Sequence, residues 1–381
     1  MPAAAAEPEL DRTLTDLQEY LNDEPPAISL PPAAFTSTAL WELERDRIFH
    51  RSWFVVARSE QLSKVGDYLA LTLAGEPVVV ARAADGLHAL SSVCRHRFMP
   101  VVESGAGNTD AFTCPYHLWR YGLDGRLRGA PFMGGNSQFS ATDCRLPAFA
   151  VQEWNGFVWV NLDPAAAPIG TELDLVADEF ANYRLAELIQ IDSWCLRWQA
   201  NWKLVMENLH ENYHVIGLHR DTLLPISLPG GGDLDVAAHS PRVVRIRIPL
   251  AMPMPAASLQ LTAIQEANIM MMTSFPGSGI LALADRVAWF GVIPTAIDQV
   301  EVRGGILATA ESVHSRDAAT DLARSILEIN EEDRIGLEAV QRGVTSRYAE
   351  RGRLSPKEAP GVLAFYRNLA DALSGPQTGG R

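Results

Sequence analysis

Four potential metal ligands lie close together in this sequence and restrict how the chain can fold. Cys94 and His96 form one pair, Cys114 and His117 form a second, and 17 residues separate the two pairs. Each pair places two ligands on one tight loop. Two β-hairpin loops that meet tip to tip can bring all four side chains to one metal centre. The sequence therefore predicts a small β domain that is built around a metal.

The residues around these pairs have the pattern of short β-strands. The runs "WFVVAR", "YLALTL", "PVVVAR" and "GFVWVNL" are apolar and β-rich, and turns with Gly, Asp or Lys separate them. We expect an all-β domain over residues 47–164. Residues 165–381 mix helical and strand patterns and indicate a larger α+β domain. Residues 1–46 are expected to form an N-terminal helical segment that packs on the larger domain.

Helical periodicity identifies the longer helices. Leu10, Leu14, Leu17 and Leu21 predict an amphipathic helix over 8–23. The stretch "STALWELERDRIFHRS" predicts a short helix capped by Ser37 or Thr38. The stretch "DAATDLARSILEINEEDRIGLEAVQRGVTS" predicts one long helix near the C-terminus.

Composition excludes some classes of protein. The net charge is −14 and the pI is about 5.1, which argues against a nucleic-acid binder with a basic face. The N-terminus does not resemble a signal peptide, and we find no uncharged apolar run of 18 residues, so we expect a cytoplasmic chain with no membrane span. Four cysteines are too few for a disulfide framework. Cys144 and Cys195 are expected to be buried and structural.

Two kinds of metal centre suit the Cys/His pairs. One is a structural zinc site with two cysteines and two histidines. The other is a Rieske [2Fe–2S] cluster, in which the cysteines hold one iron and the histidines hold the other. The spacing does not match a zinc finger, which ends in two histidines near a helix. One thiolate and one imidazole on each loop suit a cluster with two unlike ends.

A second group of possible ligands follows in "NWKLVMENLHENYHVIGLHRDT". Glu211 and His214 are three residues apart and are expected to share a helix face, and His219 can reach the same metal if the helix ends near Gly217. Two histidines and one carboxylate would complete a mononuclear Fe(II) site. Asp333 lies on the apolar stripe of the long helix, where a charge is unusual.

The neighbours of these candidates are assigned simpler roles. From spacing alone, Asp333 is either a metal ligand or a solvated acid. Glu331 and Glu332 are expected to point elsewhere and to be solvated. His210 is expected to lie on the helix surface because it faces about 100° away from Glu211.

Three motifs resemble those of Rieske non-haem iron oxygenases, in the terminal oxygenase α-subunit. They are "CPYHLWRYGLDGRLRGAP" with the Cys-x-His-Arg before it, "NWKLVMEN…ENYHV…LH", and "EEDRIGLEAVQRG". The resemblance covers about residues 35 to 370. It implies an α+β fold, with a small all-β Rieske domain and a catalytic domain whose antiparallel sheet is flanked by helices. Leu118 and Phe98 depart from the family pattern, which has Gly there, and are expected to alter loop packing.

The resemblance also implies the site residues. Cys94, His96, Cys114 and His117 would hold the [2Fe–2S] cluster. His214, His219 and Asp333 would bind the mononuclear Fe(II). Glu211 takes the position of an acid, usually Asp, that links the iron site to the cluster of a neighbouring subunit, and so implies a catalytic role and a homotrimer. A Glu here resembles the carnitine monooxygenase branch, which acts on quaternary ammonium compounds.

The function implied is that of a terminal oxygenase. A separate NAD(P)H-dependent reductase, with or without a ferredoxin, would supply electrons, because no dinucleotide-binding or plant-type ferredoxin motif is found. O2 would then hydroxylate or oxidatively demethylate a small organic substrate. The alternatives are a cis-dihydroxylating aromatic-ring dioxygenase, a Rieske electron-transfer protein without oxygenase activity, and a zinc-stabilised binding module. The pocket would be lined by methionines and aromatic residues: Met252, Met254, Met270–Met272, Phe275 and Trp289.

Overall fold

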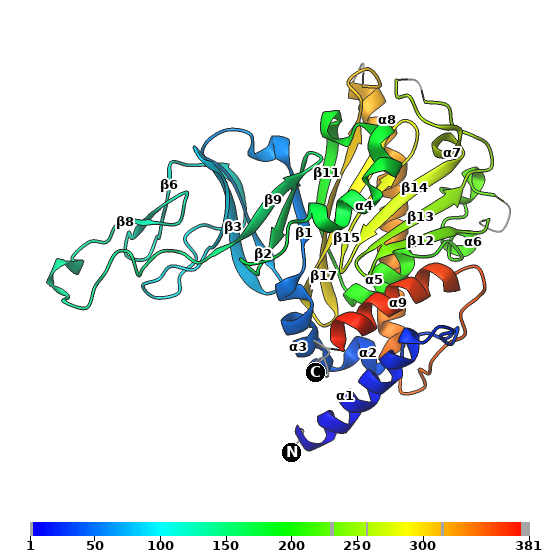
Figure 1. Ribbon diagram of the computed structural model, residues 1–381, viewed down its shortest axis with the longest axis horizontal. Coiled ribbons are helices and arrows are strands. Elements are labelled where there is room, and N and C mark those ends of the chain that lie inside the picture. Colours follow the sequence, from blue (N-terminus) through cyan, green and yellow to red (C-terminus); the bar gives the residue numbers. More distant parts are fainter. Residues whose placement is uncertain (1–2, 229–231, 257, 314–315, 375–381) are drawn as a thin grey trace, which may run out of the picture. The chain divides into compact units, whose positions relative to one another are not determined.

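The chain forms two units, each with its own core. The structure is a computed structural model, and it describes residues 3–228, 232–256, 258–313 and 316–374. The smaller unit is His50–Ile169, and the larger unit joins the chain up to Phe49 with the chain from Gly170 onward. The N-terminal helices thus belong to the same unit as the C-terminal helices (Figure 1).

The smaller unit is built from antiparallel strands, as the sequence predicted. A seven-stranded sheet has the order β1-β10-β9-β4-β3-β2-β5, and a second sheet has the order β6-β7-β8. β1 and β10 are buried along their whole length, which explains their unbroken apolar sequence. The strands are β1 Phe54–Arg58, β2 Asp67–Leu73, β3 Glu76–Ala83, β4 Gly86–Ser91, β5 Gly105–Asn108, β6 Ala111–Thr113, β7 Arg120–Gly122, β8 Leu127–Gly129, β9 Ala148–Trp154 and β10 Phe157–Asn161.

The larger unit contains one seven-stranded antiparallel sheet with the order β11-β17-β16-β15-β14-β13-β12. Strands β12 to β17 follow one another in sequence, whereas β11 pairs with β17 across more than a hundred residues. The pairing of β11 with β17 therefore brings distant parts of the sequence together at one edge. The strands are β11 Ile189–Trp198, β12 Asp235–Ser240, β13 Val243–Pro249, β14 Asn268–Ser274, β15 Ser278–Ala282, β16 Val287–Ala296 and β17 Gln299–Ala308.

Helices pack on this sheet and on one another, so the predicted α+β class is confirmed (Figure 1). The long predicted helix is α8, and Ser37 caps α3 by accepting a hydrogen bond from the backbone of Leu40. The first helix ends earlier than predicted, because a 3-10 turn follows it. The helices are α1 Ala3–Gln18, α2 Ala33–Thr36, α3 Thr38–Arg47, α4 Gly170–Phe180, α5 Trp202–Leu209, α6 Val215–Leu218, α7 Ala263–Glu266, α8 Arg316–Val344 and α9 Ala359–Leu373.

Helix α5 is fixed firmly in the core of the larger unit. The ring of Trp202 is fully buried and meets Phe49, Phe275 and Phe365, each at a steep angle between ring planes. Beside it, the buried Lys203 Nζ lies 2.6 Å from a carboxylate oxygen of Glu44. The helix that leads into the candidate iron site is therefore held by both apolar and charged contacts.

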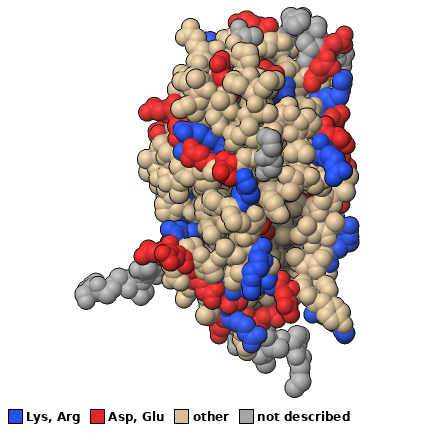
Figure 2. All heavy atoms as spheres, turned by 90° about the vertical axis from the view of Figure 1, so that its right-hand side faces the viewer, with Lys and Arg blue, Asp and Glu red and all other residues tan. Residues whose placement is uncertain are grey.

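The surface carries both signs of charge. On the face shown in Figure 2, lysine and arginine side chains are interspersed with aspartate and glutamate side chains. None of the helices in the described part of the chain combines the length and the apolar character needed to cross a membrane.

Candidate metal centres

The two Cys/His pairs lie on two loops of the smaller unit and face one another. The Nδ1 atoms of His96 and His117 are 3.2 Å apart. Two nitrogens bound at about 2.1 Å to one tetrahedral ion would be about 3.4 Å apart, so this spacing fits a single metal ion. The sulfurs of Cys94 and Cys114 are buried, and burial raises the pKa of the Cys114 thiol, with Cys94 nearby contributing. Two buried thiols and two partly exposed imidazoles form a donor set that fits a [2Fe–2S] cluster with unlike ends.

Two aromatic side chains contact the residues of this centre. The Trp119 ring stacks on His96 with ring centroids 4.9 Å apart. The Tyr121 hydroxyl lies 3.3 Å from the Cys94 sulfur and accepts a hydrogen bond from the backbone N–H of Arg95. A hydroxyl so close to a ligand sulfur can stabilise negative charge on it. Burial raises the pKa of Tyr121, so this hydroxyl keeps its proton.

The two departures from the family pattern have the same backbone conformation. Phe98 and Leu118 each follow their loop's cysteine by four residues, and each has a positive φ, of 62° and 59°. Each donates its backbone N–H to the carbonyl of that cysteine. Glycine adopts this conformation without strain, which explains the Gly of the family pattern. Both side chains are mostly exposed, so the expected change in packing does not reach the interior.

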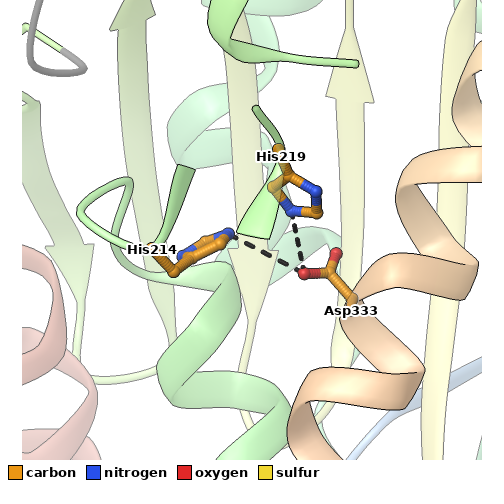
Figure 3. A group of neighbouring side chains, drawn as sticks. All are labelled: His214, His219 and Asp333. Atoms are coloured by element: carbon orange, nitrogen blue, oxygen red, sulfur yellow. Dashed lines mark hydrogen bonds and ion pairs between the residues drawn. The ribbon is translucent and has the colours of Figure 1, made fainter. Parts of the chain in front are cut away.

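The second group of ligands converges in the larger unit (Figure 3). Asp333 Oδ1 lies 3.0 Å from His219 Nε2 and 3.8 Å from His214 Nε2. His214 precedes α6, His219 follows it, and Asp333 comes from α8. One ligand atom from each residue lies within 4.8 Å of the others. Two imidazoles and one carboxylate on one side of a site are the donor set of a mononuclear iron oxygenase.

Glu211 holds His214 in this arrangement. Its Oε1 lies 2.5 Å from His214 Nδ1, and its Oε2 accepts hydrogen bonds from the backbone N–H groups of His214 and Tyr213. The expected shared helix is wrong, because α5 ends at Leu209 and Glu211 lies in the turn that follows. A turn lets one carboxylate bind both the imidazole and the backbone, and so fixes the ring orientation.

Glu332 orients the His219 ring in the same way as Glu211 orients the His214 ring. This role of Glu332 was not predicted from the sequence. Its Oε2 lies 2.7 Å from His219 Nδ1 and accepts a hydrogen bond from the Thr222 hydroxyl at 2.6 Å. The expectation that Glu332 is solvated is wrong. Burial lowers the pKa of His219, but hydrogen bonds and charges from Asp333 and Glu332 outweigh it and raise that pKa. With both Nδ1 atoms bound to carboxylates, both Nε2 atoms are left to bind a metal.

Other polar groups lie around the candidate iron site. The Asn208 amide donates to Asp333 Oδ1 at 3.0 Å. Burial raises the pKa of Glu207 to about 8. Glu207, Glu211 and His214 line one cavity of about 500 Å³.

An apolar pocket of about 230 Å³ lies beside Asp333. Its walls come from β11, β16 and α8 and include Trp194, Trp198, Phe290 and Ile329. It has the character of a small-molecule site, which is apolar with a few polar groups. A larger open hollow of about 790 Å³ shares Thr222 with this pocket.

Several single-residue expectations are wrong. None of the methionine and aromatic residues proposed for the pocket lines it among the described residues. His210 is buried, and its Nδ1 and Nε2 lie near Met206 O and the Thr273 hydroxyl. Burial lowers the pKa of His210 to about 4. Cys195 is exposed and Cys144 is partly exposed, so neither is a buried structural cysteine.

Comparisons with known proteins identify both domains. Residues 185–375 match the model of the ring hydroxylating alpha subunit catalytic domain, and residues 52–149 match that of the Rieske [2Fe–2S] domain. These two domain types imply a Rieske cluster and a mononuclear iron site. The match to the catalytic domain covers half of the chain.

Relatives by sequence are oxygenase subunits. The glycine betaine monooxygenase oxygenase subunit of Pseudomonas aeruginosa is 31% identical over 206 residues, which is 54% of this chain and 48% of the relative. The carnitine monooxygenase oxygenase subunit of Escherichia coli K12 is 30% identical over 191 residues, which is 49% of this chain and 51% of the relative. The match thus spans about half the length of these curated relatives.

Solved structures have the same fold. A quaternary ammonium Rieske monooxygenase, CntA, superimposes with a TM-score of 0.80 at 22% identity, covering 94% of this chain and 98% of the other. The naphthalene 1,2-dioxygenase of Rhodococcus superimposes with a TM-score of 0.78 at 20% identity, covering 97% and 99%. The resemblance found in the sequence motifs is therefore confirmed, and the chain belongs to the ring-hydroxylating α-subunit family of Rieske non-haem iron oxygenases.

Proposed function

We propose that this chain is a terminal oxygenase component. A separate NAD(P)H-dependent reductase, with or without a ferredoxin, supplies electrons through the Rieske [2Fe–2S] cluster to a mononuclear Fe(II), and O2 hydroxylates or oxidatively demethylates a small organic substrate. The observation that carries the proposal is the convergence of two histidines and one aspartate beside an apolar pocket.

The proposal assigns each ligand set to one group. Cys94, His96, Cys114 and His117 hold the cluster in a domain over 47–164. His214, His219 and Asp333 hold the iron in a domain over 165–381, against which residues 1–46 pack. When bound, the cluster supplies single electrons and the iron activates O2.

The side chains around the iron site orient and restrain its ligands. Glu211 and Glu332 each accept a hydrogen bond from the Nδ1–H group of one histidine and so fix which nitrogen faces the metal. Asn208 restrains Asp333 by a hydrogen bond to Oδ1. The apolar walls of the pocket exclude water from the substrate.

Glu211 has a second proposed role, which rests on its position in the family motif. There the acid links the iron site to the cluster of a neighbouring subunit. We therefore propose a homotrimer in which electrons cross between subunits. Light scattering of the purified chain tests the assembly, and a monomer with full activity would contradict it. The cytoplasmic location predicted from the sequence stays a prediction.

The names of the relatives support one substrate class. Those matched here are a glycine betaine, a carnitine and a choline monooxygenase, the last from Beta vulgaris. We therefore propose an N-methyl or quaternary ammonium compound rather than an aromatic ring as the substrate. Product analysis distinguishes the two, since demethylation releases formaldehyde and ring dihydroxylation gives a cis-diol.

The test is a count of metal combined with turnover. We expect about three irons and about two acid-labile sulfides per chain. Asp333→Ala should lose about one iron, keep the sulfide, and abolish product formation with a reductase. Asp321→Ala, an exposed acid of the same helix, should behave like wild type. About two irons per chain and an Asp333→Ala variant identical to wild type would instead indicate an electron-transfer protein.

A further inference from the structure

The apolar pocket beside Asp333 contains buried hydrogen-bond donors that find no partner in the described part of the chain. Five polar atoms of its lining are buried without a hydrogen-bond partner among the described residues. They are Trp194 Nε1, Trp198 Nε1, Arg286 Nε, Ser325 Oγ and Asn330 Nδ2. Four are N–H donors and the fifth is a hydroxyl, which can donate. A ligand with hydrogen-bond acceptors would complement this set.

The charged residues of the pocket lining also favour a ligand with hydrogen-bond acceptors. Among the residues that line the pocket, Arg286 and Asp333 are the two with a formal charge. Asp333 belongs to the candidate iron site, so Arg286 is the charge that is left to meet a ligand. A buried donor without a partner is destabilising, and a guanidinium in an apolar pocket is more so unless an anion meets it.

Arg286 is held in place without using its full set of donors. It lies just before β16, and its carbonyl accepts a hydrogen bond from the Leu283 backbone at 2.9 Å. Its Nη1 donates to Asp285 Oδ2 at 3.1 Å. The Arg286 side chain is 14% exposed and that of Asp285 is 35% exposed, so solvent weakens this ion pair. A guanidinium has five N–H donors, and Nε has no partner among the described residues.

We propose that Arg286 binds a carboxylate of the substrate, so that the enzyme acts on small organic acids. A guanidinium matches a carboxylate in geometry and binds it through two parallel hydrogen bonds. The apolar part of the acid lies along Phe290 and Ile329, towards Asp333. Compounds of the proposed N-methyl class that also carry a carboxylate satisfy this requirement. The inference rests on the proposed function only in naming the ligand a substrate.

The experiment measures binding by calorimetry on the full chain with its metals, without oxygen and without reductase. Two pairs of probes differ mainly in the carboxylate: glycine betaine with choline, and benzoate with benzamide. At least one of the two acids, glycine betaine or benzoate, should bind at least about tenfold more tightly than its partner, the matched probe without a carboxylate. That difference corresponds to about 1.4 kcal/mol. Arg286→Gln should remove this preference and leave the affinity for the partner unchanged.

Two further variants make the result specific. Arg286→Lys keeps the positive charge and should retain part of the preference. Arg303→Gln removes an arginine of similar exposure that pairs with Glu301 and does not line the pocket, and it should behave like wild type. The preference of the wild-type protein needs no variant, so it tests the proposal even if Arg286→Gln fails to fold.

Three outcomes would overturn the proposal: neither acid binds, the partners bind as tightly as the acids, or Arg286→Gln keeps the preference. None of these depends on turnover. An enzyme that prefers acids but forms no product with a reductase would contradict the proposed oxygenase function alone. An enzyme that oxidises substrates but shows no preference for acids would contradict only the role of Arg286.

Discussion

Removing the Glu332 carboxylate should weaken iron binding without removing any iron ligand. Glu332 Oε2 lies 2.7 Å from His219 Nδ1 and accepts the Thr222 hydroxyl. In Glu332→Ala both donors lose their acceptor, and the buried His219 ring loses the contact that sets its orientation. The loss of a carboxylate that orients a metal-binding histidine costs about 10–100-fold in metal affinity, or about 1.4–2.7 kcal/mol.

The structure places the expected loss at the lower end of this range. The Glu332 side chain is 31% exposed, so water can replace part of the lost hydrogen bonding. We expect Glu332→Ala to bind Fe(II) about tenfold more weakly than wild type. Glu332→Gln keeps an oxygen that can accept from His219 but loses the charge. Since a charge-assisted hydrogen bond is about twice as strong as a neutral one, its loss should be smaller.

The assay is an anaerobic titration of Fe(II) against a coloured chelator. The protein first loses its mononuclear metal and keeps its Rieske cluster, and the visible spectrum of the cluster serves as an internal standard. Glu331→Ala is the matched control. It removes the same charge one residue away, but Glu331 is half-exposed and pairs with Arg334. Equal affinity in Glu332→Ala and Glu331→Ala would refute the assigned role of Glu332.

Three further predictions concern stability. Lys203→Met should lower the free energy of unfolding by about 3–5 kcal/mol in a denaturant titration, because it leaves the buried Glu44 carboxylate without its cationic partner. The double variant Lys203→Met/Glu44→Leu should recover part of this loss, since the Trp202 Nε1–H then lacks its acceptor; a mild effect of the single variant would contradict the pairing. Leu118→Gly should stabilise the smaller unit by about 1 kcal/mol by relieving its positive φ, seen as later thermal bleaching of the cluster, and earlier bleaching would argue against strain. The pKa of His210 is lowered to about 4, so the unfolded chain takes up this proton first as the pH falls below about 6.5. The contribution of the neutral His210 to the free energy of unfolding should therefore be fully present above pH 6.5 and fall by about 3 kcal/mol towards pH 4. In denaturant titrations over this range, the stability of His210→Asn should decrease less steeply than that of wild type.

The sequence singled out the Cys/His pairs as candidate ligands because their spacing is short and their chemistry is distinctive, whereas the full ligand set of the iron site was implied by the resemblance to Rieske oxygenases. Cys94 with His96 and Cys114 with His117 each lie on one loop, so local geometry alone brings each pair together. Asp333 could be singled out because an acid on an apolar helix stripe needs a partner. The all-β and α+β parts also followed from local patterns, since β-rich runs and helical periodicity need no knowledge of tertiary contacts.

Tertiary structure decided which side chains hydrogen-bond to the candidate ligands and orient them. Neighbouring acids in a helix differ by about 100° in direction, so whether Glu331 or Glu332 meets His219 depends on how α8 is rotated against α6. The burial of His210 depends on Thr273 in a distant strand. The pocket depends on the pairing of β11 with β17 and on the packing of α8, which unite Trp194, Arg286 and Asp333. Short motifs in the sequence thus predicted the metal chemistry, whereas contacts between residues far apart in the chain determined the orientation of the candidate ligands and the shape of the pocket.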